Sequence, residues 1–186
     1  MVLKVGKRMS EDILGFWFEE MGPSKWWVKD EAVDQLIISR FSELHFAANQ
    51  GELYEWRATA KGRLAEIIIL DQFSRNMFRG SARAFASDSM AVALSQEAVA
   101  AGVDDELTDV ESSFLYMPFM HSESLLIHEV AVELYTKSGI QTNLEFEIKH
   151  KNIIEKFGRY PHRNVALGRQ STDEEIAFLK QPESSF

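Results

Sequence analysis

The sequence predicts an all-α fold of about eight helices stacked as antiparallel hairpins, and three observations support this prediction. Apolar residues recur at steps of three and four along most of the 186-residue chain, which is the period of a helix face. Three Thr-x-x-Glu motifs, at Thr108, Thr142 and Thr172, match the capping box that begins helices. No segment alternates apolar and polar residues between closely spaced turn signals, so we expect no sheet.

Three helices are predicted in the first part of the chain. Ser10 is expected to cap a helix over EDILGFWFEE, which the Gly22-Pro23 pair ends. Apolar residues share one face of residues 31–50, and Gly51 follows them as a stop signal. Residues 61–78 are apolar nearly all round in the middle, which predicts a central, buried helix.

The remaining helices follow from caps and breakers. An Ala-rich helix is expected between Asp88 and Gly102, and Met117-Pro118 is expected to end the helix that Thr108 begins. Further helices are predicted over 122–138 and 142–157, closed by Gly139 and Gly158, and a last one after Thr172.

Composition excludes several classes of protein. The chain has no cysteine, which removes disulfides, thiolate nucleophiles and cysteine-ligated metal sites. Its net charge of −9 argues against general nucleic-acid binding, because such proteins carry a basic surface. No apolar run is long enough to span a membrane, and the N-terminal MVLKVGKRMS lacks the apolar core of a secretory signal. We therefore expect one cytoplasmic helical domain over residues 1–186, with no cofactor, membrane or nucleic acid bound.

Polar residues interrupt the apolar faces of the predicted helices. Asp71 and Arg75 continue an apolar face at a spacing that lets them pair. Glu123 shares a face with apolar residues in the first turn of its predicted helix, just after His121, and His150 lies on another apolar stripe. Each has a structural interpretation as a buried ion pair, an acid at a helix N-terminus or a core histidine. The functional interpretation is that they line a pocket.

Two stretches contain arginines and no acid, which is unusual in a chain with 29 acidic residues. They are residues 72–86 and 156–169, and DQFSRNMFR at 71–79 resembles EKFGRYPHR at 155–163. The likeness arises from chance or from an internal duplication that could place four arginines around one cleft. Guanidinium groups suit carboxylate and phosphate. The expected ligand-binding residues are Asp71, Arg75, Asn76, Arg79, Arg159, His162, Arg163 and Asn164.

Five segments resemble the motifs of a known family. They are WFEEMGPSKWW, LAEIIILDQFSRNMFRG, FLYMPFMHSES, HKNIIEKFGRYPHRN and LGRQSTDEEIAFL, of which DQFSRN and FGRYPHRN are the most specific. The family is the bacterial domain of unknown function 924, and the resemblance runs from about residue 11 to the C-terminus. It implies a helical fold similar to tetratricopeptide (TPR) arrays and supplies no established activity. No repeat of about 34 residues is visible, so a TPR-like fold here means helix stacking only.

Three functions are consistent with these residues. The first, which we favour, is a pocket for a small anionic ligand that carries phosphate or carboxylate. The second is an acid–base hydrolase with candidate catalytic residues His121, Glu123 and His150, in which water attacks because no nucleophile motif is present. The third is a TPR-like protein-interaction module, so a protein partner stays open. A mixed site of His121, Glu123 and either His150 or His162 is conceivable, but we expect no metal.

Overall fold

A helix from the middle of the chain lies at the centre of the fold. In the computed structural model, which describes residues 7–182 and 184, residues 60–77 run without a break through three segments. These are α4 (Ala60–Ile68), a π-helical segment (Ile69–Phe73) and α5 (Ser74–Met77). Helix α4 packs against α1, α6 and α7, and the core residues of this central helix are almost fully buried. The predicted central helix over 61–78 is confirmed.

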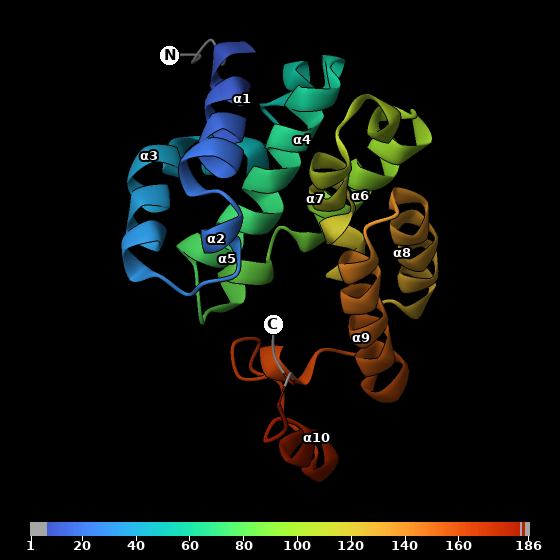
Figure 1. Ribbon diagram of the computed structural model, residues 1–186. Helices are drawn as coiled ribbons and strands as arrows, with labels where there is room; N and C mark the ends of the chain where they lie inside the picture. The colour runs from blue at the N-terminus through green and yellow to red at the C-terminus, as the bar shows by residue number, and fades with distance from the viewer. Residues whose placement is uncertain (1–6, 183, 185–186) are drawn as a thin grey trace.

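The N-terminal helices cover one side of the central helix (Figure 1). They are α1 (Lys7–Leu14), which continues as a π-helical segment (Gly15–Met21), α2 (Pro23–Trp26) and α3 (Glu31–Asn49). Gly22 ends the π-helical segment that continues α1, and its φ of 66° is one that glycine adopts without strain. The Asp30 side chain caps α3 by accepting hydrogen bonds from the backbone N–H groups of Ala32 and Val33.

Of the C-terminal helices, the first four in chain order lie on the other side, and the last, short one lies below them near the middle of the view (Figure 1). They are α6 (Asp88–Ala100), α7 (Asp109–Met120), α8 (Leu125–Ser138), α9 (Gln141–Phe157) and α10 (Asp173–Phe178). Helix α8 packs against both α7 and α9, as expected for consecutive hairpins. The capping boxes at Thr108 and Thr172 are both present, and Gly139 and Gly158 cap α8 and α9 in left-handed conformations.

Four local predictions are wrong. Ser10 lies inside α1, which already includes Lys7, so Ser10 cannot be its cap. Thr142 lies inside α9, because only Gly139 and Ile140 separate α8 from α9 and the helix has already begun at Gln141. Pro118 lies within α7, where burial of the last turn outweighs the hydrogen bond that proline cannot donate. Glu123 precedes α8, which begins at Leu125 instead of at residue 122.

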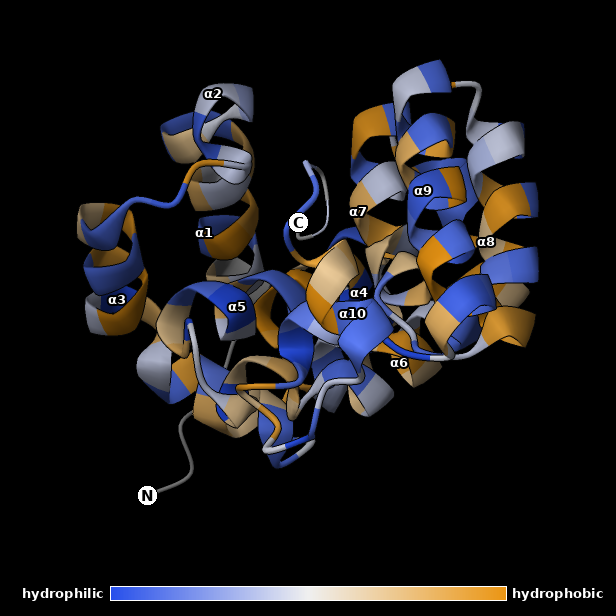
Figure 2. Cartoon of the chain, turned by 90° about the horizontal axis from the view of Figure 1, so that it is seen from below, coloured by the Kyte–Doolittle hydropathy of each residue, from blue (hydrophilic) through white to orange (hydrophobic). Residues whose placement is uncertain are grey.

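The all-α prediction is confirmed for the described part of the chain, which contains no strand. This part forms nine helices if each unbroken run of α- and π-helix is counted once and the short 3-10 turns are left out. About eight helices were expected, and the additional one is the short α2. Orange apolar residues alternate with blue hydrophilic ones along the helices in Figure 2, and one large cluster of buried apolar residues joins both halves. None of the described helices combines the length and the apolar character needed to cross a membrane.

The close approach of Gly62 to the backbone yields a stability prediction. A Cβ at this position would meet the carbonyl group of Trp56, with its carbon only 2.8 Å away, so Gly62→Ala forces the backbone to shift. We expect a loss of about 1–3 kcal/mol in the free energy of unfolding, measured by urea denaturation. The control is Gly15→Ala, where no atom lies within 4 Å and the loss of backbone freedom should stabilise by about 0.5–1 kcal/mol. Equal stabilities of the two variants would contradict this prediction.

Candidate functional site

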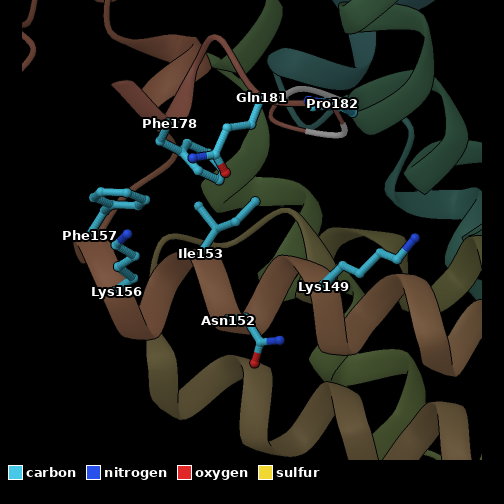
Figure 3. Close-up of a pocket in the computed structure, with 8 residues that line it drawn as sticks. All are labelled: Lys149, Asn152, Ile153, Lys156, Phe157, Phe178, Gln181 and Pro182. Atoms are coloured by element: carbon cyan, nitrogen blue, oxygen red, sulfur yellow. The ribbon is translucent and has the colours of Figure 1, made fainter. Parts of the chain in front are cut away.

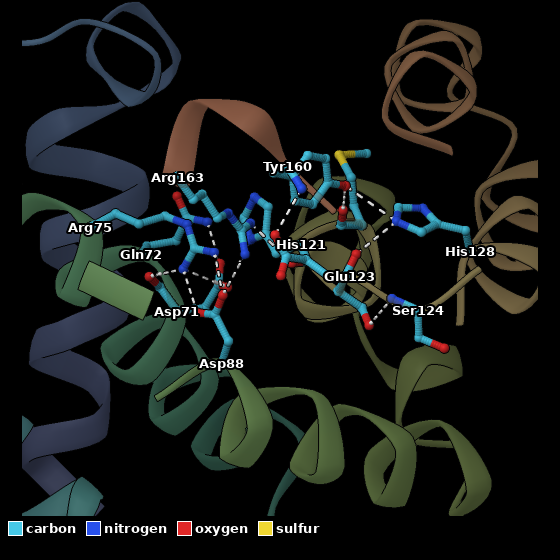
Figure 4. A network of polar contacts seen from close by, with 12 residues as sticks. Asp71, Gln72, Arg75, Asp88, His121, Glu123, Ser124, His128, Tyr160 and Arg163 are labelled. Carbon is cyan, nitrogen blue, oxygen red and sulfur yellow. Dashed lines mark hydrogen bonds and ion pairs between the residues drawn. The ribbon is translucent and has the colours of Figure 1, made fainter. Parts of the chain in front are cut away.

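A buried carboxylate and a histidine from two different helices form a hydrogen-bonded pair. Asp71 lies in the π-helical segment of the central helix, where its side chain is 1% exposed, and His121 follows the last residue of α7. The His121 Nδ1–H donates to Oδ1 of Asp71 over 2.8 Å. Within the described residues, Nε2 of His121 has no hydrogen-bond partner, and the side chain is 15% exposed. The pair thus offers a ring nitrogen that is available to a ligand (Figure 4).

The Asp71 carboxylate stays ionised although it is buried. Burial by itself would raise its pKa, but the charges of Arg75 and His121 and the hydrogen bonds from His121 and Gln72 hold the pKa well below its usual range. The Gln72 amide donates to Oδ2 over 2.6 Å, and Nη1 of Arg75 lies 3.1 Å from Oδ1. Both oxygens of Asp71 are therefore engaged, and the carboxylate is fixed in orientation.

The His121 ring is held in its neutral form. Burial and the positive charge of Arg75 lower the pKa of His121, and the opposing attraction of Asp71 does not restore it. A neutral ring that donates from Nδ1 carries a lone pair on Nε2. In this tautomer Nε2 is the ring nitrogen that can accept a proton from a bound molecule.

Two arginines from distant parts of the chain meet at one carboxylate beside this pair (Figure 4). Nη1 and Nη2 of Arg75 donate to the two oxygens of Asp88 over 3.0 and 3.1 Å. Nη1 of Arg163 donates to Oδ2 of Asp88 over 3.2 Å, and its Nη2 donates to the backbone carbonyl of His121 over 3.0 Å. Asp88, the first residue of α6, thereby joins the central helix to the segment after α9.

Arg163 is the most deeply buried of the predicted ligand-binding arginines. Its side chain is 7% exposed, and its guanidinium lies 4.7 Å from the ring centre of Phe85 and 4.4 Å from that of Tyr160. Its Nε has no hydrogen-bond partner in the part of the chain that the structure describes. Arg163 therefore acts as a packed cation that connects three segments, whereas the sequence predicts it as a ligand-binding residue.

Glu123 belongs to a neighbouring contact and does not touch Asp71. Its two oxygens accept hydrogen bonds from Arg169 over 2.6 and 2.8 Å. One of them also accepts from the backbone N–H of Tyr160 over 2.7 Å. Although burial opposes it, these partners lower the pKa of Glu123. The carboxylate anchors the turn at residues 158–161 and has no free oxygen for acid–base chemistry.

The predicted histidines His150 and His162 both lie beside Tyr160. Ring centres of His150 and His162 lie 5.8 and 5.4 Å from that of Tyr160, and His150 lies 6.5 Å from His121. Burial lowers the pKa of both His150 and His162 to about 3. The Tyr160 hydroxyl donates to the carbonyl of Met120 over 2.6 Å. His121, His150 and His162 thus form one neighbourhood of neutral rings.

We call Asp71, His121 and the side chains tied to them, Gln72, Arg75, Asp88 and Arg163, the Asp71–His121 cluster. Four of the predicted ligand-binding residues lie outside it: Arg79, Asn76, Arg159 and Asn164. Arg79 donates to both oxygens of Asp34 on α3 over 2.7 Å each, and Asn76 donates to the same carboxylate over 2.8 Å.

Near α10, the carboxylate of Glu175 binds two further predicted residues in the way that Asp34 binds Arg79 and Asn76. Arg159 donates to both oxygens of Glu175 over 2.7 and 2.9 Å, and Asn164 donates to one of them over 3.3 Å. The four arginines therefore do not surround one cleft. Only Arg75 and Arg163 meet, and these occupy non-equivalent positions of the two similar segments.

Sequence reasoning missed the carboxylates that hold these arginines. Asp88 and Glu175 were interpreted only as the start of a helix and as part of a capping box, and Asp34 was not noticed. Arg169, Gln72 and Tyr160 were also missed as members of the polar network. The one available signal was the absence of acids within residues 72–86 and 156–169, which implies that the partners come from elsewhere in the chain.

The mixed metal site considered from the sequence does not form. Among the residues that the structure describes, no three His, Asp or Glu side chains are arranged to hold a metal ion. His121 and Glu123 are directed to different partners, Asp71 and Arg169.

Comparison with known proteins identifies the family to which the chain belongs. The model of the family described as bacterial protein of unknown function (DUF924) matches residues 13–183, which is nearly the whole chain. The chain belongs to the DUF924 family. This DUF924 protein is similar to a solved structure of a protein of unknown function, ATU0120 from Agrobacterium tumefaciens. The two share 39% identity over 93% of this chain and 97% of the other, with a TM-score of 0.89. The search of curated proteins found no match.

The burial of Arg163 gives a second stability prediction. Arg163→Ala removes the hydrogen bonds to Asp88 and to the His121 carbonyl and leaves a cavity between two rings. We expect a loss of about 3 kcal/mol in the free energy of unfolding, measured by urea denaturation. The control is Arg40→Ala, whose partner Glu20 is half exposed, and it should cost about 1 kcal/mol or less. An unchanged stability of Arg163→Ala would show that this contact does not tie the segments together.

The two histidines of low pKa predict how stability depends on pH. An unfolded histidine binds a proton below about pH 6.5, whereas His150 and His162 in the folded protein do so only near pH 3. The unfolded state therefore binds more protons within this window, and stability should fall as pH falls from about 6.5. Each histidine contributes a slope of up to about 1.4 kcal/mol per pH unit.

Urea unfolding at pH 7, 6 and 5 measures this dependence. His150→Gln should flatten the slope by up to about 1.4 kcal/mol per pH unit. Burial raises the pKa of Glu147, which acts in the opposite direction, so Glu147→Gln should steepen the slope. A slope that is the same in the wild type and in His150→Gln would contradict the assignment.

Proposed function

We propose that the Asp71–His121 pair is the acid–base centre of a hydrolase in which water is the nucleophile. One observation carries the proposal: the buried Asp71 carboxylate fixes Nδ1 of His121, while Nε2 has no partner among the described residues and the ring is partly exposed. A carboxylate that orients a neutral imidazole is the arrangement by which enzymes prepare a general base. The anion pocket that the sequence favours is less well supported, because the arginines predicted to line it pair with internal carboxylates.

The chemistry follows from the protonation states. His121 is neutral near pH 7 because its pKa is lowered, so Nε2 can take a proton from a water molecule that attacks an ester. The imidazolium that forms lies beside the ionised Asp71, which stabilises the positive charge. It then gives the proton to the oxygen of the departing alcohol, which restores the neutral ring. No covalent intermediate is required, in keeping with the absence of a nucleophile motif.

The surroundings of the pair suit substrates that gain negative charge in the transition state, as esters do. The guanidinium groups of Arg75 and Arg163 lie next to it and can favour negative charge that develops in the transition state. With the carboxylates of Asp71 and Asp88 they form a group of zero formal charge, since two anions balance two cations. Glu123 and His150 act in this proposal as positioning residues around Tyr160, not as the base.

Binding of a small anion is our second proposal, and one observation favours it. Arg75 and Arg163 converge on the single carboxylate of Asp88, whose side chain is 19% exposed. A phosphate or carboxylate ligand could take the place of Asp88 between them. Arg79 and Arg159 do not support this binding mode, because each is engaged by its own carboxylate. The interaction-module hypothesis stays a prediction.

Turnover by site variants tests the first proposal. Wild type, His121→Gln and Asp71→Asn are compared on 4-nitrophenyl acetate, butyrate and phosphate by release of 4-nitrophenolate. We expect at least one ester to be hydrolysed by the wild type, with kcat/KM lowered by about 10²- to 10⁴-fold in each variant. The wild-type activity should persist to below pH 6.5 and decrease as His121 gains a proton.

A matched control separates catalysis from folding. Glu66→Gln alters another buried carboxylate, which is paired with Arg57 outside the cluster, and it should leave kcat/KM unchanged. Melting temperatures of all variants show whether each is folded at the assay temperature. Equal rates for the wild type and His121→Gln on every ester, zero rates included, would contradict the proposal.

A further inference from the structure

A cavity unrelated to the Asp71–His121 pair lies between α3 and the segment that follows α5. Its volume is about 470 Å³, within the range of small-molecule sites. It is lined by Ser42, His45, Phe46, Asn49, Met77, Phe78, Arg83, Ala86 and Ser87. A smaller cavity of about 310 Å³ lies between α9 and α10 (Figure 3), but neither of its two lysines is free, since Lys156 is paired with Glu174 and Lys149 lies over Phe146 and has a further contact. The larger cavity is therefore the better candidate for a charged ligand.

Arg83 is the feature that distinguishes this cavity. It is exposed, and it is the one lining residue of the cavity with a full formal charge. Unlike Arg75, Arg79, Arg159 and Arg163, it forms no ion pair or hydrogen bond with any described residue. Its guanidinium lies 3.8 Å from the ring centre of Phe78, and this contact holds the cation against the cavity wall.

The floor of the cavity adds polar groups without adding negative charge. Ser74 Oγ donates to the carbonyl of Leu70 over 2.6 Å, so it accepts from Nε2–H of His45 at 2.8 Å. This fixes the neutral ring with its lone pair on Nδ1. Burial lowers the pKa of His45, and the charge of Arg83 lowers it further. The Ser87 hydroxyl donates to Asn49 over 2.8 Å.

The walls are apolar. Phe46, Met77, Phe78 and Ala86 line the cavity, and Phe46 is 65% exposed although it is a large aromatic side chain. An apolar surface next to one uncompensated cation complements a molecule that has an apolar body and one anionic group. A strongly polar anion such as free phosphate has no apolar surface that could pack against these aromatic walls.

We propose that this cavity binds a small organic monocarboxylate, whose carboxylate pairs with Arg83 and whose apolar body lies against Phe46, Met77 and Phe78. The site is separate from the proposed hydrolase centre, because none of its lining residues belongs to the Asp71–His121 cluster. It is also independent of the arginines that the sequence singled out for ligand binding.

Isothermal titration calorimetry with three probes tests this site. 3-Phenylpropanoate carries the apolar body and the charge, 3-phenylpropan-1-ol carries only the body, and inorganic phosphate carries only the charge. We expect the carboxylate to bind about tenfold more tightly than the alcohol, because only the carboxylate can form a charge-assisted hydrogen bond with Arg83. Phosphate should bind most weakly of the three.

Variants locate the binding. Arg83→Gln should remove the advantage of the carboxylate over the alcohol and leave alcohol binding unchanged. The matched control is Arg40→Gln, another arginine over aromatic rings, Phe16 and Phe41, that lies outside the cavity, and it should bind as the wild type does. Thermal unfolding without ligand confirms that both variants are folded.

Four results would overturn the proposal. They are equal affinity of the wild type for carboxylate and alcohol, unchanged carboxylate affinity in Arg83→Gln, tighter binding of phosphate than of 3-phenylpropanoate, and no binding of any probe. Activity on esters does not enter these measurements, so failure of the hydrolase proposal leaves this test intact.

Discussion

An ionised side chain that leaves water requires an opposite charge or several hydrogen bonds close by, and this requirement organises the polar interior of the protein. Asp71 is the strictest case, because its carboxylate is almost completely buried on the central helix. It holds Arg75 and His121 in place, and Arg75 in turn holds Asp88, which receives Arg163. One buried charge thus sets the positions of side chains from three distant parts of the chain.

Sequence patterns identified the helices well and their ends less well. The stop at Gly51, the boxes at Thr108 and Thr172 and the left-handed cap at Gly158 depend on a few neighbouring residues, so a local pattern is sufficient to find them. Thr142 matches the same box pattern and fails, because the short turn between α8 and α9 starts the helix before it. Packing between helices decided that boundary, and a local pattern does not contain this information.

The candidate site was predicted in part for the same reason. Asp71 and His121 were selected because a polar residue on an apolar face, or next to one, must have a partner or a role. Their contact spans 50 positions of sequence, and that of Arg79 with Asp34 spans 45. No spacing rule links residues so far apart, so sequence analysis could name the arginines as unusual but could not see that each already had a carboxylate. The cavity at Arg83 was missed because its walls come from α3 and from the segment after α5.

The contact between Arg163 and Asp88 has a consequence for how the molecule is made. It joins residues 75 positions apart, and ribosomes deliver the N-terminal partner first. A nascent chain can place Asp71, Arg75 and Asp88 together while the carbonyl of His121 still lacks its donor. The polar cluster is therefore completed late in synthesis, when the segment after α9 emerges, and chains that end before Arg163 lack its contacts with Asp88 and the His121 carbonyl.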